Sequence, residues 1–232
     1  MSFCRTRLSL SFLHIIIIAT AAYFLQGGAF AQSPPSSAGS GTHASQRARS
    51  TEASLDAGSV KAGVYRNVGF GFTCKVPSGW VLRTEEMNAL DPDDAKVVGN
   101  AGKGSRVLLA AFSRPPEARA EDVNSSILIA AESVAAYPGL TDAAQYFGPV
   151  MEVAKAQGLE MDEEPYGFVL GTKSLVRGDF QKDVGKRVMR QSTLVVLVRG
   201  YVVSFTFIGG TEDEVEELVD GLSFGAGVNS TK

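Results

Sequence analysis

The chain has few cysteines, few histidines and no excess of positive charge. Its two cysteines, Cys4 and Cys74, cannot form the disulfide framework of a small secreted scaffold. The two histidines, His14 and His43, both precede the expected folded part. This excludes Ser-His-Asp and Cys-His catalysis there and removes the commonest metal ligand. A formal net charge of -3 gives no electrostatic reason to expect nucleic acid as a partner.

A complete phosphate-binding loop is also missing. The glycine-rich segment 99–105 contains one lysine, Lys103, but Gly104 follows it where the motif needs Ser or Thr. We therefore expect a mobile loop here, and no catalytic, cofactor-binding or metal-binding residue is assigned from motifs.

Two acidic runs are the remaining candidates for a cation site. The run at 91–94 begins like a calcium loop, but Ala95 and Lys96 occupy the positions of the next ligand and of the turn glycine. The second run spans 160–164. Both are expected to be solvated loops, with convergence of the two runs on one cation as the open alternative.

The first residues have the pattern of an export signal. Arg5 and Arg7 precede an apolar stretch at 8–25, and a small-x-small site follows at 29–31. Cleavage after Ala31 is expected, which would place the protein in an extracytoplasmic space, periplasmic or secreted. The alternative is an uncleaved anchor that holds the protein at the membrane, since the stretch is almost long enough to span a bilayer.

The rest of the chain divides into a linker, one domain and a tail. Residues 32–63 are rich in Ser, Ala, Gly and Pro and are expected to be a disordered linker. Residues 64–224 have the length and composition of a single domain, and 225–232 form a flexible tail. We expect a monomer.

Hydrophobic patterns within the domain predict mostly strands. Alternation of apolar and polar residues predicts a strand near 70–76, in which Cys74 shares the buried face with aromatic residues. The two clearest strands, at 188–198 and 201–208, are joined by a tight turn at Arg199-Gly200. Other strands are expected at 107–112, 126–131, 166–170 and 172–180.

Two segments have helical periodicity. The first spans 141–158 and contains Pro149, so the helix either kinks there or begins there. The second begins at Thr211, which is expected to form a capping box with Glu214 and precedes an apolar stripe that ends at Leu222. Consecutive strands with a few separate helices indicate an antiparallel α+β domain.

The order of these motifs resembles the PsbP-like domain, whose fold is shared with the Ran-binding protein Mog and with exported bacterial proteins. The resemblance rests on segments 65–67, 69–72 and 77–80, on the hairpin turn at 200–203 and on a Thr-capped helix that closes on Phe224. It implies an α/β/α sandwich around a predominantly antiparallel sheet. It also implies a non-enzymatic binding, assembly or accessory role, with no shared catalytic residue.

Two groups of residues are candidates for binding. The first is a basic patch for an acidic partner or an anionic envelope polymer, with the solvated face of a sheet as the alternative explanation. The second is an apolar pocket between sheet and helix. The expected patch comprises Lys173, Arg177, Lys182, Lys186, Arg187 and Arg190, and the expected pocket comprises Trp80, Tyr146 and Phe168.

These observations favour an exported, non-catalytic binding or accessory protein that acts on a protein or envelope partner, without a cofactor. One alternative is a carrier of a small apolar ligand, which would need a concave apolar pocket. The other is a hydrolase that uses carboxylates alone, which would need paired acids in a cleft. An exposed apolar or charged patch would favour the binding protein.

Overall fold

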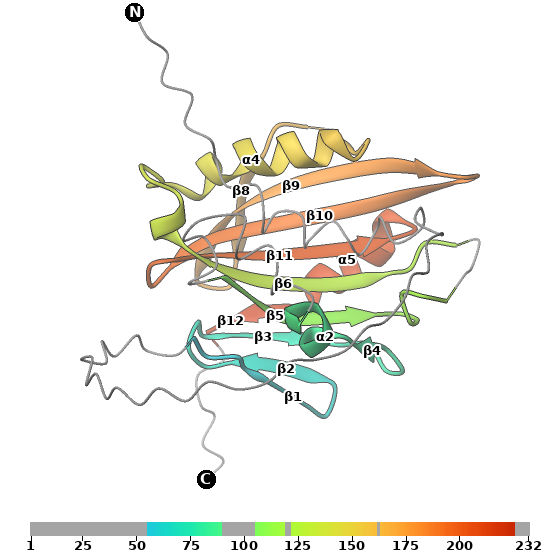
Figure 1. The fold of residues 1–232 in the computed structure, drawn as a ribbon, viewed down its shortest axis with the longest axis horizontal. Coiled ribbons are helices and arrows are strands. Elements are labelled where there is room, and N and C mark those ends of the chain that lie inside the picture. Colours follow the sequence, from blue (N-terminus) through green and yellow to red (C-terminus); the bar gives the residue numbers. More distant parts are fainter. Residues whose placement is uncertain (1–54, 90–104, 119–121, 162, 226–232) are drawn as a thin grey trace, which may run out of the picture.

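The computed structural model describes residues 55–89, 105–118, 122–161 and 163–225. Its centre is an eight-stranded sheet with the order β4-β5-β6-β11-β10-β9-β7, in which β8 also pairs with β9 (Figure 1). These strands are β4 (Val81–Leu82), β5 (Ser105–Phe112), β6 (Ser126–Ser133), β7 (Glu160–Met161), β8 (Tyr166–Leu170), β9 (Lys173–Val184), β10 (Arg187–Val198) and β11 (Tyr201–Gly209).

A second, four-stranded sheet packs against the first. Its order is β1-β2-β3-β12, with β1 (Ser59–Lys61), β2 (Val64–Asn67), β3 (Phe72–Lys75) and β12 (Leu222–Phe224). Every strand pair in the described ranges is antiparallel. The predicted hairpin at Arg199-Gly200 is confirmed, since both residues have positive φ, as the tight turn requires.

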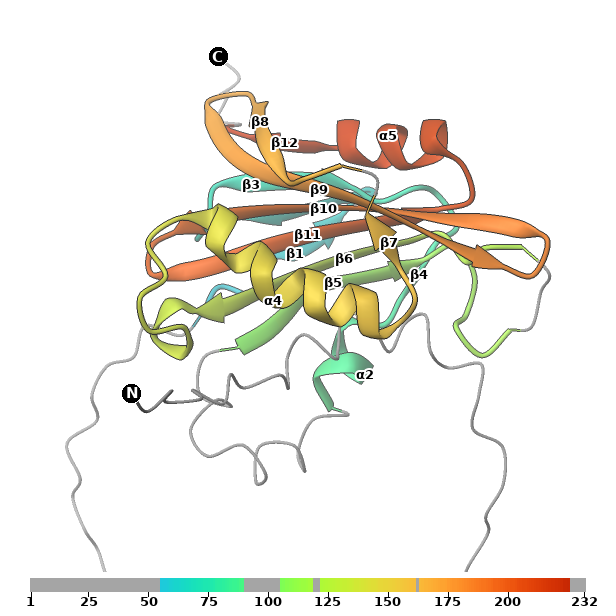
Figure 2. The same ribbon diagram turned by 90° about the horizontal axis from the view of Figure 1, so that it is seen from above.

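Helices cover both faces of the large sheet (Figure 2). Helix α4 (Ala143–Ala156) lies on one face, and the short helix α2 (Thr84–Ala89) packs on β5. Helix α5 (Glu212–Asp220) lies on the other face, which it shares with the small sheet. A 3-10 turn, η1 (Val134–Ala136), follows β6. The predicted antiparallel α+β fold with helices on both sides is therefore confirmed, and the small sheet adds to it.

The main core lies between the two sheets and α5. Phe72 of the small sheet meets Phe205 of the large sheet edge-on, with ring centroids 4.9 Å apart, and Phe224 packs against both rings. Cys74 is fully buried in this core, and burial raises the pKa of its thiol to about 12. The prediction that Cys74 is a buried small residue of the apolar core is confirmed.

Helix α4 runs through Pro149 from Ala143 to Ala156. Its N-terminus is stabilised by a complete capping box, in which the Asp142 carboxylate accepts from the Ala144 N–H at 2.7 Å and the Gln145 side chain accepts from the Asp142 N–H at 3.3 Å. This cap explains why the helix begins before Pro149, because it satisfies N–H groups of the first turn.

Residues 59–61 fall in the segment that we expected to be a linker, but they form strand β1. The residues just before them are held in place: the Asp56 carboxylate accepts from the Gly69 N–H at 2.7 Å, and the Asp56 carbonyl accepts from the Asn67 side chain at 2.8 Å. Such hydrogen bonds between distant residues leave no trace in hydrophobic periodicity.

One carboxyl group is buried in the core under α4. Glu132 at the end of β6 is 2 % exposed, and it accepts hydrogen bonds from the hydroxyls of Tyr137 and Tyr146, the latter at 2.5 Å. Burial raises the pKa of Glu132, and the two tyrosine hydrogen bonds only partly counteract this effect.

The raised pKa of Glu132 makes the stability of the protein depend on pH. The native state binds the Glu132 proton more tightly than the unfolded state, so protonation of Glu132 stabilises the fold. This stabilisation is complete below the pKa of Glu132 in the unfolded state and is lost as pH rises through its pKa in the folded state. Glu132→Gln, which stays neutral, should therefore gain stability relative to the wild type as pH is raised from 4 to 8, as measured by urea unfolding. The exposed Glu160→Gln is the control, and an equal pH trend in both variants would contradict this assignment.

Candidate functional site

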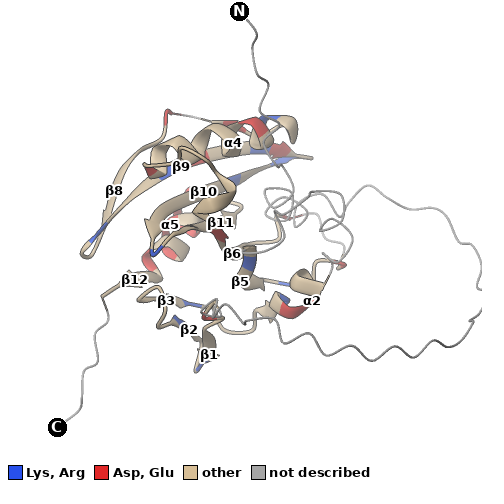
Figure 3. Ribbon diagram, turned by 60° about the vertical axis from the view of Figure 1, so that its left-hand side comes forward, with Lys and Arg blue, Asp and Glu red and all other residues tan. Residues whose placement is uncertain are grey.

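Helix α5 combines a buried apolar stripe with many acidic residues, whose positions are red on its ribbon in Figure 3. Val215, Leu218 and Val219 are buried against the sheets, whereas six of its nine residues, in the sequence EDEVEELVD, are acidic and none of its last turn is basic. Acids in the first turn stabilise a helix, and acids in the last turn face the negative end of its dipole. The C-terminal acids of α5 therefore gain nothing from the helix itself.

The start of α5 is anchored by a different arrangement from the predicted capping box. Thr211 accepts from the Glu214 N–H at 3.1 Å, as predicted. The Glu214 carboxylate, however, accepts from the Gly210 N–H at 2.8 Å and from the Ser125 hydroxyl at 2.5 Å. The reciprocal half of the box is thus replaced by a contact with a residue 89 positions away, which local spacing does not reveal.

A surface cleft of about 980 Å³, here called the α5 cleft, lies beside this helix. Its lining comes from the β1–β2 hairpin, from the segment between Lys75 and Leu82, and from α5. Apolar side chains in the lining include Val60, Val64, Val76, Trp80, Leu82 and Leu218, and its charged side chains are Lys75, Glu214, Glu217 and Asp220. The cleft therefore combines an apolar surface with an excess of negative charge.

Tight turns form two walls of the α5 cleft. Ala62 and Gly63, both with positive φ, turn the β1–β2 hairpin, and the Gly63 carbonyl accepts from the Val76 N–H at 2.7 Å. The predicted turn at 77–79 is confirmed by the hydrogen bond from the Trp80 N–H to the Pro77 carbonyl at 3.3 Å. These bonds hold Trp80, the only tryptophan of the chain, against the edge of the core.

Helix α5 forms the third wall of the cleft and is joined to the small sheet through the backbone. The Lys75 N–H donates to the carbonyl of Gly221, directly after α5, at 2.9 Å. An added Cβ at Gly221 would lie 3.0 Å from the Leu218 carbonyl and 3.3 Å from Cβ of Lys75. Glycine thus permits the close approach of α5 to β3.

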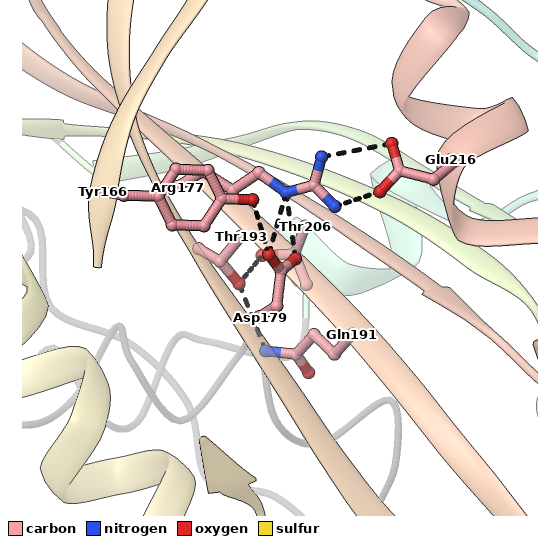
Figure 4. A network of polar contacts seen from close by, with 7 residues as sticks. All are labelled: Tyr166, Arg177, Asp179, Gln191, Thr193, Thr206 and Glu216. Atoms are coloured by element: carbon pink, nitrogen blue, oxygen red, sulfur yellow. Dashed lines mark hydrogen bonds and ion pairs between the residues drawn. The ribbon is translucent and has the colours of Figure 1, made fainter. Parts of the chain in front are cut away.

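On its other side α5 is held by a network around Arg177 (Figure 4). The Arg177 guanidinium, 7 % exposed, donates to both carboxylate oxygens of Glu216 and, at 2.9 Å, to Asp179. Tyr166 donates to Asp179 at 2.9 Å, and the Phe168 ring lies 5.3 Å from the guanidinium carbon. Burial disfavours the charged guanidinium, but Glu216 and Asp179 outweigh this effect and raise the pKa of Arg177.

The network borders a second, smaller cavity of about 340 Å³. Its lining includes Arg177 and Arg190 together with Glu163, Asp179, Glu212 and Glu216. Buried hydroxyls of Thr193 and Thr206, 3.4 Å apart, lie nearby with the Gln191 amide (Figure 4). Since Arg177 already bonds two carboxylates, this arrangement fastens α5 to β9 and does not offer an unsatisfied anion site.

The six residues of the expected basic patch do not share one surface. Arg177 is buried and ion-paired, and Lys182, on the opposite face of β9, donates to the Gln157 carbonyl at 2.6 Å after α4. Lys173 begins β9, whereas Lys186 and Arg187 lie at the other end of the strand, roughly 36 Å away at the usual rise per residue. Arg190 lines the smaller cavity.

The three residues of the expected apolar pocket are also separated. Trp80 and Phe168 pack against the core between the sheets, whereas Tyr146 lies in the other core, beneath α4. Of the three, Trp80 lines the α5 cleft. The acidic side of this cleft was not predicted from the sequence, although the run of acidic residues in α5 is visible there.

The residues that the structure describes contain neither a metal-binding cluster nor a membrane-spanning helix. In the described ranges, no group of three or more His, Cys, Asp or Glu side chains is arranged to hold a metal ion. Asp91, Asp93 and Asp94, and the loop at 99–104, lie outside these ranges. The described helices are all too short or too polar to cross a bilayer.

No family model matches the chain, and no curated protein is significantly similar to it in sequence. Solved structures that are similar include cyanobacterial PsbP from Synechocystis, with 15 % identity over 70 % of this chain and 91 % of that chain and a TM-score of 0.40. The yeast Ran-binding protein Mog1p has 13 % identity over 69 % of this chain and 94 % of its own, with a TM-score of 0.37.

A third similar structure is LpqN of Mycobacterium tuberculosis, a protein involved in cell envelope biogenesis. It is 15 % identical over 66 % of this chain and 82 % of its own, with a TM-score of 0.33. These structures thus include a PsbP protein and a Mog protein, the two groups that the sequence motifs resemble. At such identities the likeness concerns the fold and not the function.

The Arg177 network should contribute measurably to stability. Arg177→Met removes the guanidinium that Glu216 and Asp179 share, so we expect the free energy of unfolding to fall by about 2–3 kcal/mol in urea unfolding. Arg187→Met, at an exposed position of the β9–β10 hairpin, should change it by less than about 0.5 kcal/mol. If the free energy of unfolding fell equally in the two variants, the Arg177 network would make no stabilising contribution of its own.

Proposed function

We propose that this protein is an exported, non-catalytic binding protein that holds a partner protein or envelope component in the α5 cleft and acts as an accessory or assembly factor. The observation that carries the proposal is the α5 cleft itself. It is a surface feature with several apolar side chains in its lining, among them Trp80 and Leu82, the latter 42 % exposed. Apolar surface gathered in one place and bordered by charge is typical of a binding site for another molecule.

The shape and lining of the cleft favour a macromolecular partner over a small apolar ligand. A carrier needs a concave pocket that buries most of its ligand. In the α5 cleft, by contrast, exposed residues such as Ser78, Gly79 and Glu217 contribute to the lining. Trp80, the one expected pocket residue found there, packs at the edge of the core and not inside it.

Export and reach are parts of the same proposal. The pattern of residues 1–31 supports a secretory signal that is cleaved after Ala31. The Ser-, Ala- and Gly-rich segment that follows would then separate the domain from the new N-terminus. If the signal is retained as a membrane anchor, a binding domain on such a spacer would reach partners near the membrane. If the signal is cleaved, the domain would diffuse freely.

Site-directed photo-crosslinking tests the proposed binding site. A photo-reactive amino acid at Ser78, an exposed residue of the cleft lining, should give crosslinked products in the native extracytoplasmic fraction. The same amino acid at Glu152, exposed on α4, is the control and should give few or none. Products should be identified by mass spectrometry, with native mass spectrometry of the purified mature chain alongside.

Two outcomes would contradict the proposal. Absence of products from position 78, or equal products from positions 78 and 152, would show that the α5 cleft is not a binding site. A fixed mass increment that is lost on denaturation would indicate a bound small molecule and would favour the carrier instead.

A further inference from the structure

The charges of the α5 cleft are unbalanced. Its lining contains three carboxylates, on Glu214, Glu217 and Asp220, and one ammonium group, on Lys75. Glu214 is occupied with the Gly210 N–H and the Ser125 hydroxyl. Glu217 and Asp220 are exposed, and no ion pair of either is found among the described residues. Two carboxylates are therefore available to a ligand in the cleft.

The position of these two carboxylates makes a cation favourable there. Both lie in the second half of α5, toward the negative end of the helix dipole, and no basic residue is present in the last turn. A positive group bound beside Glu217 and Asp220 would interact favourably with both side chains and with the helix end. An anionic partner would meet repulsion from all three.

Apolar side chains stand next to these charges in the same cleft. Val60 lies in β1 of the small sheet, Val76 directly follows β3, and Trp80 follows the turn after β3. A hydrated metal ion or a polyamine would use the acids but not this surface, and a purely apolar ligand would leave the acids unused. A polypeptide that carries cationic and apolar side chains in alternation matches both, because an extended chain presents them on opposite sides.

We infer that the α5 cleft binds an extended, cationic segment of a partner protein, whose lysine or arginine side chains lie beside Glu217 and Asp220 and whose apolar side chains contact Trp80. This inference rests on the proposed function, because it names the chemistry of the partner at the same site. It also reverses the charge expected of the partner, because in the sequence the basic residues of β9 and β10 suggested an acidic partner.

Trp80 provides a direct readout of occupancy, because it is the only tryptophan of the chain and lines the cleft. The mature chain should be titrated with a terminally blocked heptapeptide of alternating lysine and valine. A saturable shift of the Trp80 emission is expected, and raised salt should weaken the binding. The same peptide with serine in place of lysine should bind at least about fivefold more weakly, since it loses the charge contacts.

Two double variants with the same change of net charge distinguish a local effect of the cleft carboxylates from an effect of the net charge of the protein. Glu217→Gln with Asp220→Asn should weaken binding of the lysine peptide by about fivefold. Glu212→Gln with Asp213→Asn removes two acids from the other end of α5, outside the cleft lining, and should change it by less than about twofold. Far-ultraviolet circular dichroism should confirm that both variants fold.

The inference is overturned by equal weakening in the two double variants, by equal binding of the serine peptide, or by the absence of any Trp80 shift at millimolar lysine peptide. Its failure is distinguishable from that of the proposed function. If crosslinking at position 78 captures a partner whose contact segment is not cationic, the binding function stands and the chemistry assigned here is wrong. If crosslinking captures nothing, both fail.

Discussion

The aromatic contact between the two sheets is the interaction on which the rest of the molecule depends. Phe72 belongs to the small sheet, Phe205 to the large sheet, and Phe224 to the strand that directly follows α5. Edge-to-face contacts of this kind contribute about 0.5–1.5 kcal/mol each beyond the apolar area they bury. Because the three rings meet, the small sheet, the large sheet and the end of α5 are fixed relative to one another, and the α5 cleft lies along that junction.

The carboxylates of α5 have different structural tasks. Glu214 holds the start of the helix to Ser125, and Glu216 holds its outer side to Arg177 and so to β9. Glu217 and Asp220 point to neither anchor and line the cleft. The acids that fasten α5 therefore keep it rigid, and a rigid wall lowers the entropy lost when a partner binds. In the proposed function, stability and recognition would thus be divided among neighbouring residues of one short helix.

Much of the fold was predictable because it depends on local patterns. The long strands β5, β6, β10 and β11 contain continuous or alternating runs of apolar residues, and the turn between β10 and β11 has an Arg-Gly sequence. The short strands β1, β2, β4, β7 and β12, of two to four residues, were missed, since so few residues carry no period. Leu222, predicted as the end of the helical stripe, begins β12 instead. Strand β1 pairs with β2, and the residues just before it are held by hydrogen bonds of Asp56 and Ala57 with residues 65–69, which no pattern within 55–61 encodes.

The candidate site was less predictable, because it depends on which distant charges meet. Strand periodicity places Arg177 and Lys182 on opposite faces, but it does not reveal that Glu216, 39 residues later, neutralises the former. Likewise, Trp80 could be singled out as an aromatic candidate, yet its neighbours in the cleft come from segments near residues 60 and 217. The positions of these segments follow from the packing of the two sheets and not from any local spacing.

The burial of Cys74 would matter if the protein is exported, as proposed, to an oxidising compartment. After cleavage at the proposed site Cys74 would be the only cysteine of the mature chain, and it would couple two molecules if it reached the surface. In the fold it pairs with Leu222 across β3 and β12 and is covered by the aromatic core. The same packing that shapes the α5 cleft thus shields the thiol, and the rate at which a soluble alkylating reagent reaches it would report how often the two sheets separate.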